Sequence, residues 1–444
     1  MSTVLAGGGA WAQTDRERDL EARVAQLESM VQQLLSQQQS LQGEQEAVRS
    51  EQQVQAARLD RLPAAPEGAQ PVQATTIVPG STPRANFTFG GFIKLDAMLT
   101  DTNDGQIADG SAGRLFYLPQ AIPVGGQGDS NPYLDVHAQF SRIWFAADTT
   151  LDSGDKLRGY LEFDLFGGAL GNEAATNTYG VTVRHAFATW RSWLAGQTWS
   201  NFQDVAALPD AVDFVGPTDA TTFVRQSQLR YTKGPWSFSF ENPETVLTPY
   251  QGNATRLLTG DNVLPDFTAR YQMRGSWGHF SAAALLRSLR YENPAAGIDD
   301  SAPGYGISVS GRYNLGTSDN LRYMITGGRG INRYIGLSAT TDAVIDQNGQ
   351  LEPIDSLAGF VAWQHVFNPK FRSNVFYSRA EYDNDANLTG LGITKRLESW
   401  HANLIWTILP RLDLGIEGIW GKRTLERGDS GELNRLHFHA RYSF

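Results

Sequence analysis

Residues 436–444 read Leu436-His-Phe-His-Ala-Arg-Tyr-Ser-Phe444, so apolar and polar side chains alternate with a period of two. This is the period of a β-strand whose two faces meet different surroundings. In a soluble sandwich the apolar face would form the core and the charged face would meet water, whereas in a membrane barrel the apolar face meets lipid. The rest of the chain decides between these two folds.

Segments with the same alternation recur from residue 84 to residue 444. In one of them Phe267, Ala269 and Tyr271 alternate with Thr268 and Arg270. Sixteen strands are predicted, with approximate cores at 86–99, 137–149, 156–166, 179–190, 193–199, 223–233, 236–242, 266–274, 277–291, 304–315, 321–334, 356–367, 371–382, 398–409, 412–424 and 434–444. Single-chain bacterial barrels have an even number of strands, and sixteen leave an aqueous channel.

The connections between these segments alternate between short and long. Short ones such as Gly234-Pro235 and Pro410-Arg411 are followed by long ones such as 247–264 and 383–396. Short periplasmic turns and long external loops are typical of outer-membrane barrels, so we predict an all-β transmembrane barrel of antiparallel strands over 84–444. The aromatic residues Phe438, Tyr442 and Phe444 resemble the C-terminal signal that the barrel-assembly machinery reads, and we expect them to serve as that signal.

The composition excludes several classes of protein. The 444 residues contain no Cys, so a disulfide framework, a Cys-ligated zinc and a thiol nucleophile are all absent. The formal charge of -10 argues against nucleic acid as a partner. No run of 18 apolar residues occurs, which excludes a membrane-spanning helix but leaves a barrel open. We expect no cofactor.

Three segments precede the predicted barrel. Residues 1–12 end on Ala10-Trp11-Ala12, the small-x-small pattern of a signal-peptidase site, and we interpret them as a signal-peptide remnant whose true start lies upstream; a disordered tail is the alternative. Residues 14–62 carry a heptad repeat, which predicts a periplasmic coiled coil. Residues 63–83 contain five prolines and form a semi-rigid linker.

The heptad repeat has both apolar and polar positions in its seam. Polar seam residues set the register and the number of chains, so an oligomer is favoured over a lone amphipathic helix on another surface. The apolar seam residues are Leu20, Val24, Leu27, Val31, Leu34, Leu41, Val48, Leu59 and Leu62, and the polar ones are Gln38, Gln45, Gln52 and Gln55.

The coiled coil, the proline-rich linker, the opening strand Phe89-Gly-Gly-Phe-Ile-Lys-Leu-Asp96, the segment Gly196-Gln-Thr-Trp-Ser200 and the terminal Phe444 together resemble the DcaP-type trimeric porins of Gram-negative outer membranes. The resemblance implies a homotrimer in the outer membrane, with lipids and lipopolysaccharide around it. It also implies a preference for small anionic solutes such as dicarboxylates.

The charged residues of the predicted inner face support an anion channel. Rings of Arg or Lys select anions in pores, and Arg can bind a carboxylate through two parallel hydrogen bonds. The cations expected to face the lumen are Lys94, Arg142, Arg158, Arg184, Arg230, Arg270, Arg274, Arg312, Arg322, Arg435 and Arg441, against Asp96, Glu162, Asp164, Glu241, Asp413 and Glu417. The alternative is that these arginines only solvate the wall and pair with the acids. The pattern does not decide which face Arg225, Arg287, Arg329, Arg333 and Arg379 occupy.

The long connection 201–222 is a candidate constriction loop. In porins the corresponding loop folds into the barrel, and Asp204, Asp210, Asp213 and Asp219 would then face the arginine wall. The alternative is an external loop whose aspartates meet only water.

We predict no enzyme activity. Gly428-Asp-Ser-Gly431 matches only part of a serine-protease signature, and a catalytic triad is recognised by geometry. His437 and His439 share one face of a strand but lack a third metal ligand, and Asp101-Thr-Asn-Asp-Gly105 misses the spacing of a calcium loop. The alternative function is a structural tether between the outer membrane and peptidoglycan through the coiled coil, with transport secondary.

Overall fold

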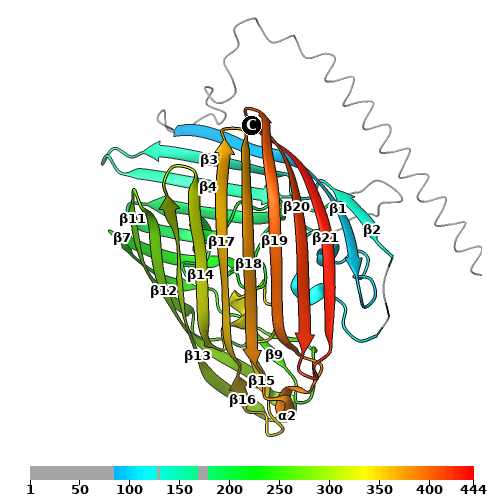
Figure 1. Cartoon of the computed structure of the whole chain (residues 1–444). Helices are drawn as coiled ribbons and strands as arrows, with labels where there is room; N and C mark the ends of the chain where they lie inside the picture. Colours follow the sequence, from blue (N-terminus) through cyan, green and yellow to red (C-terminus); the bar gives the residue numbers. More distant parts are fainter. Residues whose placement is uncertain (1–84, 127, 129–130, 169–178) are drawn as a thin grey trace, which may run out of the picture. The chain divides into compact units, whose positions relative to one another are not determined.

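The computed structural model describes residues 85–126, 128, 131–168 and 179–444. They form an antiparallel sheet of seventeen segments that closes on itself (Figure 1). Two of these segments, β2 and β3, occupy one place beside β1, so the barrel has sixteen strands as predicted. The expected signal segment at 1–12, coiled coil at 14–62 and linker at 63–83 lie outside the described residues.

The strand boundaries follow the alternating segments closely. The barrel strands are β1 (Ala85–Thr102), β2 (Tyr133–His137), β3 (Arg142–Thr150), β4 (Lys156–Asp164), β5 (Thr182–Trp190), β6 (Trp193–Trp199), β7 (Arg225–Lys233), β8 (Trp236–Glu241), β11 (Asp266–Gly275), β12 (Gly278–Asn293), β13 (Ile298–Leu315), β14 (Asp319–Arg329), β17 (Asp355–Asn368), β18 (Phe371–Asp383), β19 (Thr394–Leu409), β20 (Leu412–Leu425) and β21 (Ser430–Ser443).

The two ends of the chain of strands close the barrel. β1 pairs with β21 from Phe92 to Thr102, and its first half pairs with β3 from Ala85 to Phe92. Side chains alternate between the faces: on β21 Leu436, Phe438 and Tyr442 are exposed on the outside, while His437 between them is fully buried. The outer face is thus the apolar one, and the charged face points inward.

One predicted strand is interrupted. The alternation predicts a continuous strand over 137–149, but residues 138–141 leave the ladder between β2 and β3. The Ser141 hydroxyl fills the gap, since it accepts from the Lys94 N–H at 3.1 Å and lies 3.3 Å from the Lys94 carbonyl oxygen. A side chain therefore replaces one rung of backbone pairing.

Another predicted strand is shorter than expected. The segment 321–334 was predicted as one strand, but β14 ends at Arg329 because Gly330 adopts φ 66° and turns the chain inward. Residues Asn332–Tyr334 then form a single 3-10 turn, η6. Arg333 is consequently a loop residue.

The long loops carry structure of their own. Two of them contribute a small four-stranded sheet of β9 (Thr245–Thr248), β10 (Leu257–Thr259), β15 (Ala343–Ile345) and β16 (Leu351–Pro353). Leu247, Ala343 and Leu351 of this sheet pack on Leu289 and Ala302 of the barrel wall. Other short helical segments are η2 (Ala112–Arg114), η3 (Pro119–Ala121), η4 (Val205–Ala207), η5 (Pro294–Ala296) and α2 (Ala386–Thr389). Within the described residues, no helix is both long and apolar enough to cross a membrane.

Candidate functional site

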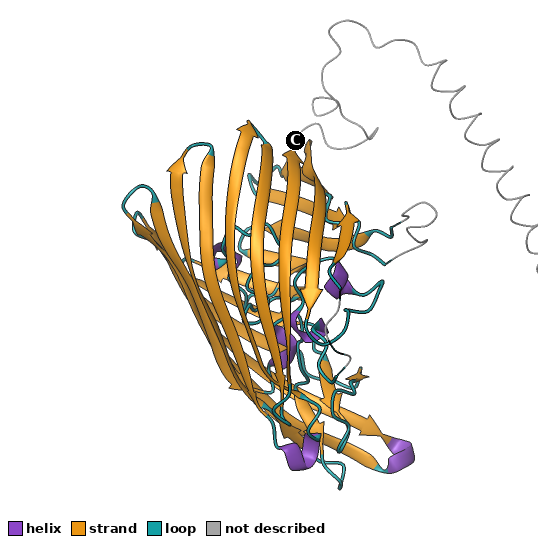
Figure 2. Cartoon of the chain, turned by 45° about the vertical axis from the view of Figure 1, so that its right-hand side comes forward, coloured by secondary structure: helices purple, strands orange, loops and turns teal. Residues whose placement is uncertain are grey.

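The loop between β6 and β7, residues 200–224, passes through the inside of the barrel. Phe202, Ala207 and Val212 of this loop are almost fully buried. The loop bonds to inward side chains of β1, β13 and β20, which lie far around the wall from its own ends. Figure 2 shows loops and short helices between the strands of the wall. This segment, named here the inner loop, is the one predicted to fold inward at 201–222.

Four cations of the wall bind the backbone at and within the inner loop. Such a segment has no ladder partner, so its buried peptide groups need hydrogen bonds from elsewhere. Because these donors are charged, the bonds are stronger than neutral ones. Lys94 donates to the carbonyl oxygen of Val212 at 2.8 Å, Arg230 to that of Trp199 at 2.5 Å, Arg270 to that of Gln203 at 2.8 Å, and Arg322 to that of Leu208.

Two wall carboxylates bind the N–H groups of the same loop. Glu241 accepts from the N–H of Asn201 at 2.8 Å, and Glu417 accepts from the N–H of Val212 at 2.7 Å. Both acids were predicted to face the lumen, and both are nearly inaccessible to solvent. The wall therefore supplies donors to the carbonyl oxygens of the loop and acceptors to its N–H groups.

The four aspartates of the inner loop all contact the wall. Asp204 lies 2.8 Å from the His279 ring and accepts from Ser310, and Asp210 pairs with Arg372 at 2.5 Å. Asp213 lies 3.7 Å from the His437 ring and accepts from the N–H of Tyr117 at 2.7 Å, and Asp219 accepts from the hydroxyls of Tyr117, Ser378 and Ser399. Only Asp210 meets an arginine. The carboxylates thus lie in contact with the wall rather than facing it across open space.

Asp213 and Asp219 are both buried, yet their pKa values move in opposite directions. Burial raises the pKa of Asp213, but the His437 ring and the N–H of Tyr117 stabilise its anion more, so the pKa lies below its usual range. Burial raises the pKa of Asp219, and the hydroxyls that bond to it only partly offset this effect. Asp213 holds the loop as an anion, whereas Asp219 has a desolvation cost when it is charged.

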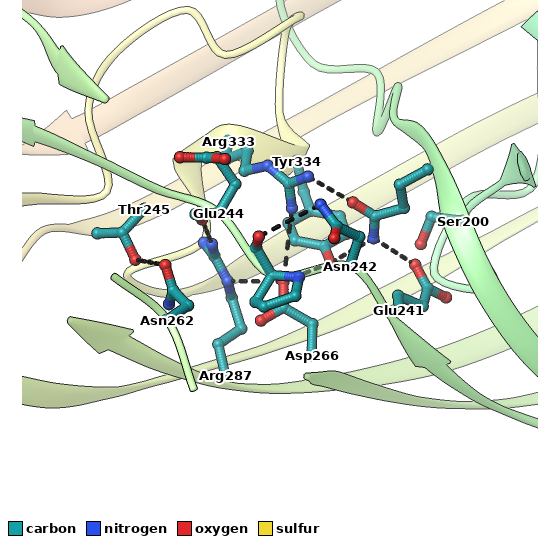
Figure 3. A network of polar contacts seen from close by, with 12 residues as sticks. Ser200, Glu241, Asn242, Glu244, Thr245, Asn262, Asp266, Arg287, Arg333 and Tyr334 are labelled. Carbon is teal, nitrogen blue, oxygen red and sulfur yellow. Dashed lines mark hydrogen bonds and ion pairs between the residues drawn. The ribbon is translucent and has the colours of Figure 1, made fainter. Parts of the chain in front are cut away.

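A buried network of charges holds the external loops against the wall (Figure 3). Arg287 of β12 is fully buried and lies 3.1 Å from Asp266 and 2.9 Å from Asp342. Tyr334 donates to Asp266 at 2.8 Å, and Arg333 approaches the same carboxylate at 3.5 Å. Arg287 and Arg333, which the sequence left unassigned, both point into this network.

On β3, β4 and β5 the arginines share carboxylates of their own wall. Arg184 donates to Glu162 at 2.9 Å and to Asp164 at 2.8 Å, and Arg142 lies 3.5 Å from Glu162. The register of β4 with β5 skips Arg184, so this residue is a β-bulge and turns inward beside its neighbour His185. The charges of this cluster largely compensate each other.

Several inward arginines have no carboxylate oxygen within 4.0 Å among the described residues. Besides Arg423 and Arg435, they are Arg230, Arg270, Arg274, Arg312 and Arg322. Register places three of them in one row around the wall: Arg274 lies opposite His279, His279 opposite Arg312, and Arg312 opposite Arg322. This row, near the short turns, leaves positive charge on the inner face.

The family model for the DcaP outer membrane protein matches residues 27–444. The chain belongs to the DcaP family. It is an outer-membrane porin with the channel fold of that family.

Three solved structures resemble this chain to different degrees. The crystal structure of the outer membrane channel DcaP of Acinetobacter baumannii is 25% identical over 81% of this chain and 98% of that chain, with a TM-score of 0.67. OmpT of Vibrio cholerae is 13% identical over 81% of this chain and 98% of that chain, with a TM-score of 0.48. Salmonella typhi OmpF is 12% identical over the same shares, with a TM-score of 0.47. No curated protein sequence matches the chain.

The remaining predicted lumen residues of this DcaP porin also have partners on the wall or its loops. Arg158 lies 3.6 Å from Asp148 with both side chains partly exposed, and Arg441 donates to Asp413 at 2.8 Å. Lys94 also pairs with Asp96 at 2.8 Å, and Arg435 is buried against Thr100 and the carbonyl oxygen of Gly113. The predicted assembly-signal residues Phe438, Tyr442 and Phe444 are exposed on the outer face.

Several residues of the site were not among those predicted from the sequence. Arg372, which bridges Asp210 and Asp413, obeys the inward parity of β18 and could have been found from it. Tyr117 lies in the loop after β1, which has no periodic pattern. The contacts of its hydroxyl and N–H with the inner loop could therefore not be predicted. Arg225, at the start of β7, stacks on Trp199 at 5.0 Å, and Arg379 pairs with Glu381.

The features that resemble enzyme or metal sites have structural partners in the DcaP fold. The His437 ring lies 2.8 Å from Asp96, and His439 lies 3.4 Å from the carbonyl oxygen of Val212. Within the described part of the chain, no group of three His, Asp or Glu side chains is arranged to hold a metal ion. The porin family and fold indicate a channel rather than an enzyme.

Proposed function

We propose that this porin lets small anionic solutes, dicarboxylates among them, diffuse passively through a lumen narrowed by the inner loop. The observation that carries the proposal is the row Arg274, Arg312 and Arg322, together with Arg230 and Arg270, on the inner face without any carboxylate within 4.0 Å among the described residues. Uncompensated positive charge in a low-dielectric channel raises the local concentration of anions and speeds their entry.

The test is the reversal potential of the purified porin in a planar bilayer under a salt gradient. We expect anion preference at low salt. It should weaken in concentrated salt, because long-range attraction fades within a Debye length of about 8 Å at physiological ionic strength. Cation preference at low salt would overturn the proposal.

We further propose that the porin is a homotrimer, and that the helical segment 14–62 lies in the periplasm. The support is the family membership and the heptad pattern of the sequence. Deleting residues 14–62 should leave a trimeric, conducting barrel, as measured by native electrophoresis and conductance. Recovery of monomers alone would show that the helix dictates assembly. The tether to peptidoglycan stays a prediction for this segment.

The outer-face aromatic Phe444 is proposed to act during insertion. Its backbone exchanges hydrogen bonds with Gly91 at 3.0 and 3.3 Å, which any residue could do, whereas its side chain is exposed. Phe444→Ala should therefore lower the amount of barrel inserted into the outer membrane more than it lowers the heat stability of purified barrels. Equal amounts of mature barrel in cells making either chain would contradict this role.

A further inference from the structure

An apolar groove of about 570 Å³ crosses the outer face of the barrel where β18, β19, β20, β21 and β1 lie side by side (Figure 1). At its floor Ala402 of β19 lies opposite Gly418 of β20, so two adjacent outward positions have almost no side chain. Trp400 and Trp420 lie opposite each other on the side toward the long loops, and Leu436 of β21 lies opposite Gly418. The groove therefore faces the membrane.

The open floor of the groove is not forced by the packing of the wall. The φ of Gly418 lies outside the left-handed region, and a Cβ built on it would meet no atom within 4 Å. On the same strand, a Cβ at Gly415 would lie 2.8 Å from the His439 ring, and one at Gly421 would lie 2.5 Å from the Tyr117 ring. Those two glycines make room for side chains inside the barrel, whereas Gly418 leaves space for something outside it.

The outward residues of β19 and β20 give the depth of the groove in the membrane. Those between the groove and the short turn are apolar and exposed: Leu404, Trp406, Leu414 and Ile416. Beyond Trp400 and Trp420 the outward residues become charged, as Glu398 and Lys422 show. Aromatic residues mark the interfaces of outer-membrane barrels, so the groove lies just inside the leaflet that the long loops face.

The charged rim above the groove contains a guanidinium that the wall does not use. Among the described residues, no carboxylate oxygen lies within 4.0 Å of Arg396, and its Nε is buried without a hydrogen-bond partner. Glu381, which lies opposite Arg396 in the ladder, is bound by Arg379 instead. Lys422 pairs with Glu432 at 2.8 Å. Arg396 thus keeps its donors for an anionic group from outside the chain.

We infer that the groove and Arg396 together bind lipopolysaccharide, with one acyl chain in the groove and a phosphate of lipid A at the guanidinium. Arg396 and Ala402 are six residues apart, which is roughly 20 Å along the strand. With a strand tilt of about 40° this becomes a depth of about 15 Å, close to half the hydrocarbon thickness of a bilayer. A lipid whose phosphate lies at Arg396 therefore has its acyl chains at the level of the groove.

The two parts of the site contribute different kinds of interaction. Lipid tails are as apolar as the wall, so the groove adds affinity only through close packing around the chain. Arg can bind a phosphate through two parallel hydrogen bonds, so Arg396 selects a phosphorylated headgroup. A second copy of the chain would bring no phosphate to Arg396, and for this reason a lipid is the better occupant. The inference is independent of the anion selectivity proposed above.

The test uses the purified porin, with its whole chain, in a nonionic detergent and lipid A as the probe. Native mass spectrometry measures the fraction of porin that carries lipid A as the lipid is titrated, and we expect saturable binding. Gly418→Leu should lower the apparent affinity about fivefold or more, because the leucine fills the floor of the groove. Arg396→Gln should lower it about tenfold, because the charge-assisted pair to the phosphate is lost.

A matched control is Gly159→Leu on β4. Gly159 lies between the exposed Leu157 and Leu161 on the outward parity, and a Cβ there would also meet no atom within 4 Å. This variant should leave the apparent affinity within about twofold. Lipid A without its phosphates should bind the wild type as weakly as intact lipid A binds Arg396→Gln. Single-channel conductance of all three variants should equal that of the wild type, because the changes lie on the outer face.

The outcomes separate the site from its alternatives. Equal effects of Gly418→Leu and Gly159→Leu would overturn the groove, and equal binding of phosphatidylglycerol would overturn the assignment to lipopolysaccharide. A change of oligomeric mass in Gly418→Leu with unchanged lipid A affinity would assign the groove to contact between copies and overturn the inference. If Gly418→Leu yields no barrel, Arg396→Gln decides, since unchanged binding by that variant would overturn the phosphate contact. Cation preference of the wild-type channel would overturn only the proposed function.

Discussion

Arg322 and Arg274 are the same kind of residue on the inner face of the same barrel, but their surroundings differ. Arg322 donates to the carbonyl oxygen of Leu208, to Asn320 and to Gln364. Arg274, three positions along the same row, has Gln272 as its hydrogen-bond partner and is exposed. One arginine holds the inner loop and the other faces the solution. The comparison teaches that a count of lumen charges does not measure selectivity, because many of these charges are engaged in holding the fold.

The largest difference in the free energy of unfolding is expected between variants of the buried Arg287 and of the exposed Arg274 near the short turns. Arg287→Ala leaves Asp266 and Asp342 buried without their main partner, so the free energy of unfolding should fall by about 3–5 kcal/mol. Arg274→Gln should change it by less than about 0.5 kcal/mol. Denaturant unfolding of the barrel in detergent measures both. Similar losses of unfolding free energy for the two variants would show that buried and exposed inward arginines do not differ in their role.

A smaller contrast is expected inside the inner loop. The pKa of Asp213 is lowered because His437 and the N–H of Tyr117 outweigh burial, so its stabilisation is present above about pH 4 and lost as the pH falls below that value. The pKa of Asp219 is raised by burial, so its contribution is present below about pH 4 and lost as the pH rises through its folded pKa.

Asparagine variants separate these two aspartates at pH 7. Asp213→Asn should destabilise the loop by about 1–3 kcal/mol, because three backbone N–H groups lose an anionic acceptor. Asp219→Asn should be neutral or stabilising, because it removes the desolvation cost. Limited proteolysis of the folded barrel at pH 7 reports loop release. Faster cleavage of the Asp219→Asn variant than of Asp213→Asn would contradict the assignment.

The ion selectivity of two double variants, each of which removes two positive charges, tests the same comparison. The double variant Arg274→Gln and Arg312→Gln removes two arginines that bind no backbone carbonyl oxygen among the described residues. Arg230→Gln with Arg322→Gln removes two that bind backbone carbonyl oxygens, those of Trp199 at the end of β6 and Leu208 in the inner loop. We expect the first pair to shift the reversal potential toward cations more than the second, and the second to increase current noise. Equal shifts with quiet currents would show that backbone bonding does not neutralise a lumen arginine.

The smallest effect is expected at the exposed pair of Arg158 and Asp148. Their closest atoms are 3.6 Å apart and both side chains are about two-fifths exposed, at 44% and 42%. Exposed ion pairs contribute about 0–1 kcal/mol, so Arg158→Gln should leave the unfolding midpoint nearly unchanged. A loss approaching that of Arg287→Ala would show that exposure is a poor guide to the role of an arginine here.

Much of the barrel could be predicted because its physics is local. Period-two alternation fixes which face of each strand meets lipid, and turn residues such as Gly234 mark where strands end, so the sixteen strands were found within a few residues. The two errors, at 138–141 and after Arg329, are places where tertiary contacts override the pattern. Ser141 bonds across to Lys94, and the residues after Gly330 are drawn into the Asp266 network.

The site was less predictable, because it depends on which partner each charge finds. Parity placed Arg270 and Arg322 on the inner face, but the carbonyl oxygens that they bind belong to a loop without periodicity. The inner-loop aspartates were likewise identified, while their partners Ser378, Ser399 and Tyr117 carry no charge that would mark them. Long-range pairing of this kind leaves no trace in a single sequence.

The interruption of the wall at residues 138–141 predicts where backbone hydrogen bonds of the barrel open most easily. Around Lys94, β1 keeps its full pairing with β21 on one side, while on the other a serine hydroxyl stands where a backbone rung would be. Amide hydrogen exchange reports the free energy of local opening, and it is lowest where few backbone bonds must break together. Deuterium uptake at the β1 to β3 edge should therefore outpace uptake at the β20 to β21 edge, so that any fissure in the wall starts beside Ser141.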